Sequence, residues 1–429
     1  MKVSYPFPPG FLWGAATSSH QVEGDNRWND WWAFEQSGRL PYRSGEACRH
    51  YHLYERDFDL ARALGHNAHR FSIEWSRIEP AEGHWDFEAM SHYRAVIEAL
   101  IERRLEPVVT LHHFTNPAWF SDRGGWLRKD SPKFFSRYAE HVMKQLGARV
   151  KYWITINEPT VYVMQGYING EWPPFCKSAC IKSVTAFKNL ARAHIAAYRT
   201  LHELRRDIMV GFAHSAPLVM PCNPRQKRDC LAARVRDWIL NRSFFYFLQP
   251  PFFGKLPRER LDFIGINYYT RTLIRGSGWG PSAILGRACH LPHHIDQGAT
   301  SDTGWEIYPS GLQTVLERFS HWGIPLMVTE NGVATDNEAL RREFLLSHLE
   351  SLAEALRKGV NVVGYLYWSL IDNFEWAMGT RPRFGLAAVD FWSQERKLRA
   401  FAEDYKRVCS ENRLALVKEC REMRVAAYS

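Results

Sequence analysis

The sequence has 429 residues, of which 45% are hydrophobic and 14% aromatic, so the chain can bury a large core. No apolar run approaches the length of about 18 residues that a membrane-spanning helix needs. The formal net charge is +9, but Lys and Arg are spread over the whole chain and accompany no nucleic-acid-binding motif, which argues against nucleic-acid and membrane partners.

The cellular compartment is predicted from the N-terminus and the cysteines. The opening residues, MKVSYPFPPGFLWG, lack the charged and apolar regions of a signal peptide. Eight cysteines are scattered without paired metal-ligand spacings, and Cys176 and Cys180 have no second half to complete a zinc site. We therefore expect reduced thiols, a cytoplasmic location and no metal.

Eight short runs, rich in β-branched and aromatic residues, recur along the chain. They are residues 11–18, 68–76, 107–114, 152–159, 208–216, 262–270, 325–333 and 362–370. Segments of helical period lie between them, for example 51–65, 91–104 and 342–359. Continuous apolar strands that alternate with helices indicate a parallel sheet covered by helices. Eight such units predict an α/β fold, a single (β/α)8 TIM barrel that spans residues 1–429 as one domain.

An open, doubly wound sheet is the competing fold, and it is disfavoured because no G-x-G-x-x-G turn follows the first run. In a closed barrel the carboxyl ends of the strands share one rim. Polar and aromatic residues at these ends should therefore converge there, namely Gln21, Glu23, Arg70, Glu74, His112, His113, Asn157, Glu158, Asn267, Tyr269, Glu330, Trp368, Glu375 and Trp376.

Two of these residues are carboxylates at the tips of apolar runs. Glu158 ends YWITINEP and Glu330 follows PLMVT, and Pro159 both ends the strand ladder and restrains the backbone of Glu158. Each Glu alone could be a helix N-terminal charge or part of a buried ion pair. Two on one rim suit glycosidic cleavage, in which one acid protonates the departing oxygen and the other attacks or stabilises the sugar carbon.

Six motifs, in their order and approximate spacing, resemble glycoside hydrolase family 1, the family of retaining β-glucosidases and β-galactosidases. They are FLWGAATSSHQVEG, HRFSIEWSRIEP, TINEP, DFIGINYYTR, TENG and YWSLIDNFEW, and together they cover nearly the whole chain. The resemblance implies a retaining hydrolase of terminal non-reducing β-D-glycosides or oligosaccharides that works by double displacement and needs no cofactor. It favours β-glucosides and leaves β-galactosides and β-fucosides open.

The resemblance also implies a role for each matching residue. Glu158 would be the acid/base and Glu330 the nucleophile, with Arg70, Asn267 and Tyr269 supporting the nucleophile. Trp368 would be the floor under the non-reducing sugar, and Trp305 would line the leaving-group side. The hydroxyl groups of that sugar would be held by Gln21, His113, Asn157, Glu375 and Trp376.

Charge considerations agree with these roles. A nearby Arg and a Tyr hydroxyl both favour the ionised form of Glu330. Facing that charge, Glu158 should have a raised pKa and keep its proton. Once the sugar esterifies Glu330, the charge disappears and Glu158 can act as a general base.

Departures from the family pattern bear on specificity. In TLHHFTNP the chain has Phe114 where the family usually has Trp. The adjacent His112 and His113 point to opposite sides of a strand, so a shared metal is disfavoured against sugar bonding by His113 with His112 packed behind it. After the last strand, Glu375 and Pro382 replace the residues that bind a sugar phosphate in 6-phospho-β-glycosidases, so unphosphorylated sugars are favoured.

Two further hypotheses stay open. One is a catalytically silent barrel that binds a glycan or a partner protein, although neither Glu is lost. The other concerns the short connection 217–260, which contains Phe244, Phe245, Phe247, Phe252 and Phe253. These rings either pack on the barrel helices or make an exposed, mobile apolar flank, and a homo-oligomeric contact is one use of such a flank.

Overall fold

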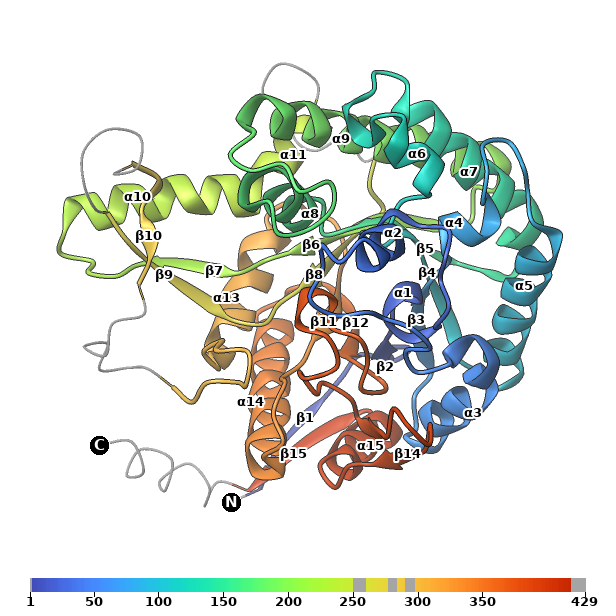
Figure 1. The fold of residues 1–429 in the computed structure, drawn as a ribbon. Coiled ribbons are helices and arrows are strands. Elements are labelled where there is room, and N and C mark those ends of the chain that lie inside the picture. Colours follow the sequence, from blue (N-terminus) through green and yellow to red (C-terminus); the bar gives the residue numbers. More distant parts are fainter. Residues whose placement is uncertain (1, 250–259, 277–283, 290–297, 418–429) are drawn as a thin grey trace.

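The structure is a computed structural model that describes residues 2–249, 260–276, 284–289 and 298–417. Eight parallel strands close into a barrel in the order β11-β12-β2-β3-β4-β5-β6-β8 (Figure 1). The predicted (β/α)8 barrel is thereby confirmed, and each of the eight predicted runs contains one barrel strand. In chain order the strands are β2 (Leu12–Ala16), β3 (Ala68–Ser72), β4 (Glu106–His112), β5 (Tyr152–Asn157), β6 (Met209–Ser215), β8 (Phe263–Asn267), β11 (Leu326–Asn331) and β12 (Val362–Trp368).

The strands are rich in apolar residues because both of their faces are buried. In β5, Ile154 packs in an inner cluster with Val108 and Met327 of other strands. Its neighbour Trp153 belongs to a separate, outer cluster that the helices cover. Side chains of a strand point alternately to its two sides, so this sorting places one cluster inside the barrel and the other outside it.

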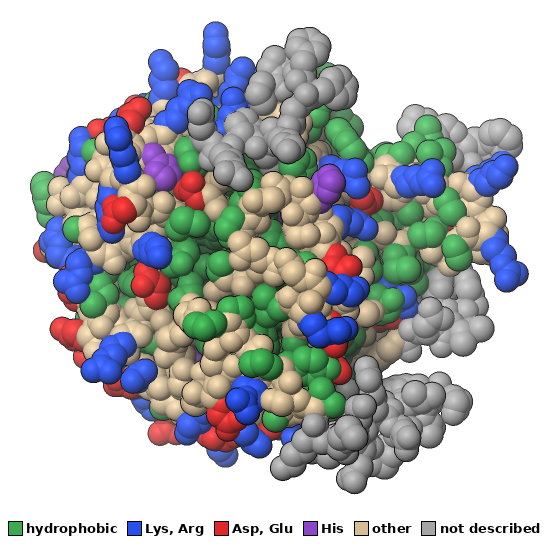
Figure 2. All heavy atoms as spheres, turned by 180° about the vertical axis from the view of Figure 1, so that it is seen from behind, with side chains coloured by type: hydrophobic (Ala, Val, Ile, Leu, Met, Phe, Trp, Pro, Cys, Tyr) green, Lys and Arg blue, Asp and Glu red, His purple; other side chains and the backbone are tan. Residues whose placement is uncertain are grey.

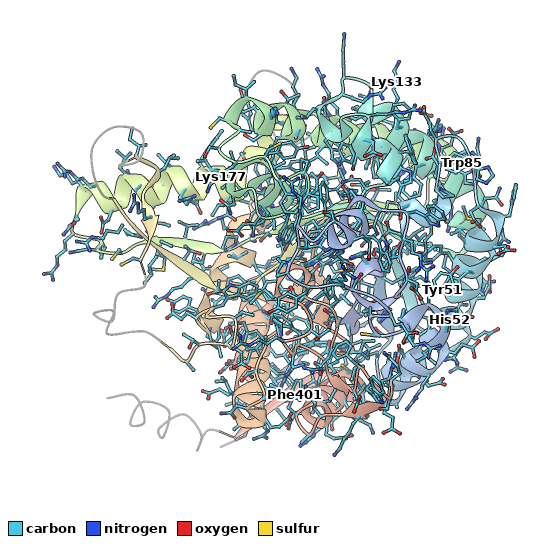
Figure 3. All side chains as sticks on the ribbon, in the orientation of Figure 1. Tyr51, His52, Trp85, Lys133, Lys177 and Phe401 are labelled. Atoms are coloured by element: carbon cyan, nitrogen blue, oxygen red, sulfur yellow. The ribbon has the colours of Figure 1, made fainter. Side chains whose placement is uncertain are left out.

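Apart from α10, the long helices surround the barrel, and their side chains fill the space between the two layers (Figures 1 and 3). The predicted helical segments are confirmed as α3, α5 and α14. Asp86 and Asn337 begin two of these helices, and each side chain accepts a hydrogen bond from a first-turn amide. The long helices are α3 (His50–Ala63), α5 (Phe87–Glu102), α7 (Ser131–Leu146), α9 (Cys180–Leu204), α10 (Lys227–Asp237), α13 (Pro309–Ser320), α14 (Glu338–Arg357) and α15 (Ala402–Glu411).

Shorter helices occupy the connections. They are α1 (Ser19–Val22), α2 (Asp30–Gln36), α4 (Trp75–Ile78), α6 (Ala118–Asp122), α8 (Pro159–Val163) and α11 (Ser243–Leu248), with single turns η1 (Gly125–Leu127), η2 (Gly147–Arg149), η3 (Met164–Asn169), η4 (Trp238–Arg242) and η5 (Trp376–Met378). None of the described helices is both long and apolar enough to cross a membrane. Lys and Arg side chains are dispersed over the face seen in Figure 2, with acidic side chains among them.

Three small sheets lie outside the barrel. Strand β1 (Lys2–Pro6) pairs with β15 (Arg413–Val417), and β13 (Ala387–Val389) pairs with β14 (Arg396–Leu398). The third sheet has the order β10 (Arg287–Ala288), β9 (Arg271–Arg275), β7 (Leu218–Pro221). Figure 1 shows this third sheet projecting from the barrel together with α10, and it is called the projecting sheet below.

The structure shows whether two of the Phe residues in the connection after β6 pack on the barrel or form an exposed flank. Phe244 and Phe245 are buried, at 0% and 1% exposure, and both pack on Phe212 of β6. The interpretation that the rings pack on the barrel layers is confirmed for these two, and the exposed flank is wrong for them. Phe252 and Phe253 lie outside the described residues, and the mobility of 217–260 stays a prediction.

Candidate active site

A pocket of about 320 Å³ opens at the carboxyl ends of the barrel strands. Of the residues to which the family resemblance assigns a role, Arg70 alone does not line the pocket, because its side chain is fully buried. The residues that the pocket brings together are Gln21, His113, Asn157, Glu158, Asn267, Tyr269, Trp305, Glu330, Trp368, Glu375 and Trp376. The prediction that strand ends converge on one rim therefore holds for residues up to 355 positions apart in the chain.

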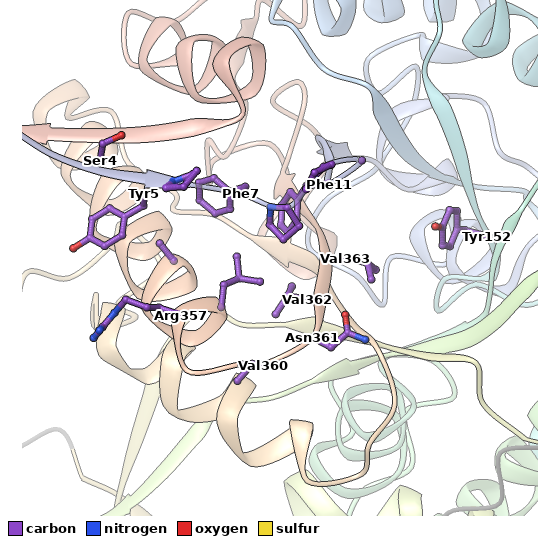
Figure 4. A pocket seen from close by; sticks show the side chains of 17 residues that line it. Ser4, Tyr5, Phe7, Phe11, Tyr152, Arg357, Val360, Asn361, Val362 and Val363 are labelled. Atoms are coloured by element: carbon purple, nitrogen blue, oxygen red, sulfur yellow. The ribbon is translucent and has the colours of Figure 1, made fainter.

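A second hollow, of about 880 Å³, lies at the amino-terminal end of the barrel (Figure 4). Phe7, Phe11, Val360 and Val362 line it together with backbone of the two chain segments that carry them. No carboxylate or imidazole occurs among the described residues around it. It is larger than the rim pocket and is lined by the hydroxyl groups of Ser4, Tyr5 and Tyr152, but its described lining residues include no carboxylate or imidazole that could act as a base for them.

Glu330 sits at the end of β11 and is held by a cation and a hydroxyl. Arg70 Nη1 donates to Glu330 Oε1 at 2.6 Å, and the Tyr269 hydroxyl donates to Oε2 at 2.7 Å. The guanidinium of Arg70 is itself fixed, because Nη2 donates to Asn157 Oδ1 at 2.7 Å and Nε donates to Thr110 Oγ1 at 3.0 Å. Both oxygens of Glu330 are therefore oriented before any substrate binds.

Glu158 has different surroundings. It stands between β5 and α8, and its Oε1 accepts a hydrogen bond from Asn267 Nδ2 at 2.9 Å. The same Asn267 amide contacts Asn157 Oδ1 at 3.2 Å, and its hydrogen bonding also lowers the pKa of Glu330. Asn267, expected to support the nucleophile, thus lies between both carboxylates. No ion pair to Glu158 occurs among the described residues.

These surroundings act differently on the pKa values of the three buried carboxyl groups in the pocket. Burial, and then the negative charge of Glu330, raise the pKa of Glu158 to about 8. The same two causes raise the pKa of Glu375 to about 8. Burial also raises the pKa of Glu330, but the Arg70 charge and the Tyr269 hydroxyl oppose that rise. Of these three buried acids, only Glu330 has a cationic partner among the described residues, which favours its ionised form.

The inner end of the pocket presents amide and imidazole groups. Gln21 Nε2 donates to Glu375 Oε2 at 3.1 Å, and the side chain of Asn157 lies 3.2 Å from His113 Nε2. Burial, and then the charge of Arg70, lower the pKa of His113 far below its usual value, so the imidazole is neutral. Neutral donors and acceptors of this kind suit the hydroxyl groups of a sugar.

Aromatic rings form the walls. His113 lies between Trp368 and Trp376, stacked on each with ring centroids 6.0 and 6.2 Å apart. At the outer end Trp305 is 38% exposed and lies 5.3 Å from the ring of Tyr269. Flat apolar faces beside hydrogen-bonding groups favour a ligand that has both, as a pyranose does.

Three pocket residues adopt left-handed backbone conformations that side chains other than glycine seldom accept. They are Phe114 (φ 73°), Glu158 (φ 43°) and Trp376 (φ 50°). Each such residue costs on the order of 1–3 kcal/mol, which the surrounding packing must offset. Such strain is common at functional sites, although residues away from the pocket, such as Ala47 and Arg104, share this conformation.

His112 is packed behind the wall, as expected. Its Nε2 lies 3.0 Å from Asn116 Oδ1, and its ring meets Trp126 edge-on. Within the described parts of the chain, no group of three or more His, Cys, Asp or Glu side chains could hold a metal ion. Phe114 lines the pocket and contacts Trp376, so it keeps an apolar wall at this place.

Besides Arg70 and His112, two further predicted rim residues do not line the pocket. Glu23 binds Arg77 Nε at 2.7 Å and the Tyr93 hydroxyl at 2.8 Å, while Glu74 accepts hydrogen bonds from Ser19 and Thr115. Their expected place on the rim is correct, but their carboxylates face a buried polar network beside it.

Several lining residues were missed, and all of them except Ser215, which ends β6, come from connections instead of barrel strands. Those on the outer side are Val161, Gln165, Glu171, Trp172, Ser215, Pro217, Thr270, Ala377, Met378 and Phe384. Trp172 is the most prominent, since its ring packs against both Phe114 and Trp376. The cluster of aromatic residues and prolines in EWPPF was the available signal for it.

Comparisons with known proteins agree with this geometry. The family model for glycosyl hydrolase family 1 matches residues 3–261 and 255–414. The 1,4-beta-D-glucan glucohydrolase of Thermotoga neapolitana is 30% identical over 452 residues, which cover 95% of this chain and 99% of that protein. Among solved structures, a beta-glycosidase from Pyrococcus horikoshii superimposes with a TM-score of 0.90 at 40% identity, with 98% of each chain covered.

A structure of the beta-glucosidase from Thermotoga maritima in complex with castanospermine is also similar. It gives a TM-score of 0.88 at 29% identity and covers 95% of this chain and 99% of that one. The likeness therefore extends over the whole barrel and its connections, and not over the six motifs alone.

Proposed function

The chain belongs to glycosyl hydrolase family 1, and we propose that it hydrolyses terminal, non-reducing, unphosphorylated β-D-glycosides with retention of configuration. The observation that carries this proposal is the contrast between the two carboxyl groups. Glu330 is bound by Arg70 and Tyr269, whereas Glu158 has an amide partner and a raised pKa. One acid is thereby kept ionised and the other protonated in the same pocket.

In the first step, an oxygen of Glu330 attacks the anomeric carbon of the sugar. Glu158 transfers its proton to the glycosidic oxygen, and the leaving group departs as an alcohol. The bond from carbon to the leaving oxygen breaks as the ester bond to Glu330 forms. Arg70 and Tyr269 stabilise Glu330 in the required charge state and orientation before attack.

In the second step, the ester has removed the negative charge from Glu330. The main electrostatic cause that raised the pKa of Glu158 after burial is then gone, so its carboxylate form becomes accessible. Glu158 takes a proton from water, whose oxygen attacks the anomeric carbon and releases Glu330. Two displacements at one carbon restore the original β configuration.

Substrate class follows from the pocket walls. Trp368 and Trp376 offer ring faces, and Gln21, His113 and Glu375 offer hydrogen-bonding groups at the inner end. β-Glucosides are the favoured substrates, in line with the names of the glucohydrolase and beta-glucosidase relatives. A relative from Pyrococcus woesei is named Beta-galactosidase, so galactosides belong in the test.

The preference for unphosphorylated sugars rests on a different cause from the one expected. Repulsion of a phosphate by an ionised Glu375 is weakened, because burial and Glu330 raise the pKa of Glu375 to about 8 and it holds a proton at neutral pH. The stronger reason is that no Lys or Arg occurs among the described residues lining the pocket. A phosphate dianion would therefore be buried without a cationic partner.

We further propose a cytoplasmic location and a role in carbohydrate metabolism. The location is supported by the described cysteines, which are thiols and not disulfides in the structure. A catalytically silent barrel remains the competing hypothesis for activity, and both carboxyl groups in catalytic surroundings argue against it.

Rates on 4-nitrophenyl β-glucoside, β-galactoside, β-fucoside and β-glucoside 6-phosphate test the proposal. We expect turnover to be highest on the glucoside and lowest on the phosphate ester. Proton NMR of the first-formed sugar should show the β-anomer, which then mutarotates. An initial α-anomer would contradict the mechanism, and no turnover on any glycoside would favour the silent barrel.

A further inference from the structure

Two cysteines in the projecting sheet bring their sulfur atoms together. Cys222 follows β7 and Cys289 follows β10, with β9 between these two edge strands. The thiol of Cys222 donates to the sulfur of Cys289 at 2.8 Å, although the residues are 67 positions apart. We propose that this pair is a site of disulfide formation, and that its oxidation clamps both edge strands across β9.

The backbone holds both cysteines in place. The amide of Cys222 donates to the carbonyl of Ile274 at 2.8 Å, and the amide of Cys289 donates to the carbonyl of Leu273, also at 2.8 Å. Adjacent carbonyls of β9 thus fix the two residues from opposite sides. Since a disulfide has a sulfur–sulfur bond of about 2.05 Å, the sulfurs need to approach by less than about 1 Å.

The turns next to the pair are anchored as well. Asp229 in the first turn of α10 is buried, and its carboxylate accepts a hydrogen bond from the amide of Asn223 at 3.0 Å. Its other oxygen accepts one from the amide of Gly276 at 2.9 Å. The residue after Cys222 and the residue after β9 are therefore bound to the same side chain, which limits how far the thiols can separate.

A crosslink between these cysteines should stabilise the projecting sheet, because the sheet has only a small hydrophobic core. That core consists of Val219, Ala232, Ala233 and Ile274, with Leu240 against it. The sheet also continues directly from the rim pocket. Strand β7 starts at the residue after Pro217 and β9 starts at the residue after Thr270, and both of these residues line the pocket.

The oxidation is a thiol–disulfide exchange with a low-molecular-weight disulfide such as oxidised glutathione. Cys222 is the entry point, because it is partly exposed whereas Cys289 is 8% exposed. The Cys222 thiolate attacks one glutathione sulfur, forms a mixed disulfide and releases one glutathione thiolate. The Cys289 thiolate then attacks the Cys222 sulfur and releases the second. The two protons of the protein thiols end on the two glutathione molecules.

The pair reacts faster at alkaline pH. Burial, and then hydrogen bonding to Cys289, raise the pKa of Cys222 to about 12. Only the thiolate attacks a disulfide, so the rate of crosslinking should increase with pH over the range in which the protein stays folded.

Mass spectrometry of the full-length protein tests the proposal. The protein is incubated with oxidised glutathione at alkaline pH, remaining thiols are blocked with N-ethylmaleimide, and the digest is mapped. We expect a peptide pair linked through Cys222 and Cys289, absent in Cys222→Ser and in Cys289→Ser. The matched control Cys180→Ser, which removes an exposed thiol elsewhere, should keep the link.

Two outcomes would overturn the proposal. In one, Cys222 and Cys289 both carry maleimide in the wild type while the exposed Cys180 has reacted with glutathione, which proves that the oxidant was active. In the other, Cys222 is linked to Cys230 of α10 instead.

Hydrogen exchange tests the clamp itself. Exchange of the β9 amides in the oxidised wild type should be about 100-fold slower than in the reduced protein. Oxidant should leave exchange in Cys289→Ser unchanged. Equal exchange in both redox states of the wild type would refute the clamp even if the crosslink forms. Neither readout requires glycosidase activity, so its outcome is independent of the proposed function.

Discussion

Replacing Glu330 by Gln should lower the pKa of Glu158, because it removes the charge that helps Glu158 to keep its proton. In retaining glycosidases the two carboxyl groups are about 5–5.5 Å apart. At that distance, and with an effective dielectric constant of about 20, one unit charge contributes about 3 kcal/mol, or about 2 pKa units. Burial persists in the variant, so we expect the pKa of Glu158 to fall from about 8 to about 6.

Carbon-13 NMR of glutamate labelled at the side-chain carboxyl can follow this titration. The resonance of Glu158 is identified by its loss in Glu158→Gln. Glu171→Gln is a matched control, since it removes an exposed carboxylate from the rim of the same pocket and should leave the pKa of Glu158 unchanged. An unchanged pKa in Glu330→Gln would refute the reasoning, because burial alone would then account for the protonated acid.

Three further predictions concern catalysis by the wild-type enzyme and two variants. Activity should fall as pH rises through about 8, because Glu158 must be protonated to release a poor leaving group, and the fall should vanish for a dinitrophenyl glycoside that needs no proton; an identical fall for both substrates would contradict this. Tyr269→Phe removes a hydrogen bond that lowers the pKa of Glu330, so the acid limb of the pH profile of kcat/KM should move to higher pH and kcat should drop by about 10-fold or more. An acid limb that stays in place would contradict this role of Tyr269. Glu375→Ser should lose activity on glucosides without gaining it on a 6-phosphoglucoside, because no Lys or Arg is among the described residues that line the pocket; a variant that prefers the phosphorylated sugar would show this to be wrong.

The barrel could be predicted because its strands are buried on both faces. Runs such as 152–159 and 325–333 begin with a continuous apolar stretch, and each one contains a barrel strand, with edges displaced by no more than a few residues. The carboxylates at their tips were visible because a charged residue at the end of a buried strand is unusual. The rim residues could be predicted because the carboxyl ends of the parallel strands lie on the same side of a barrel.

Other features have a weak local signal or none. Trp172 and Phe384 reach the pocket from connections whose path depends on tertiary packing; the aromatic residues and prolines of EWPPF are a signal for Trp172, and nothing periodic marks either residue. The strands of the projecting sheet are short, two to five residues, and lie apart in the chain. Cys222 and Cys289 meet only because β9 brings their strands together, a proximity that cysteine spacing cannot express.

The direction of the pKa shift of Glu158 was predicted correctly, but its main cause was not. Sequence reasoning assigned the raised pKa of Glu158 to the charge of Glu330, whereas burial is the larger cause and the charge is second. Burial of a carboxyl group is a property of the closed barrel and its aromatic walls. The same cause acts on Glu375, which is why its protonation was not foreseen.

Trapping of the covalent intermediate tests the central assignment most directly. A 2-deoxy-2-fluoro-β-glucoside with an activated leaving group slows the second displacement more than it slows the first in this mechanism, so the sugar ester should accumulate. After digestion, mass spectrometry should find the fluorosugar on Glu330 and nowhere else. A label on Glu158 or Glu375, or complete turnover of the reagent with inversion and no labelled peptide, would contradict the account.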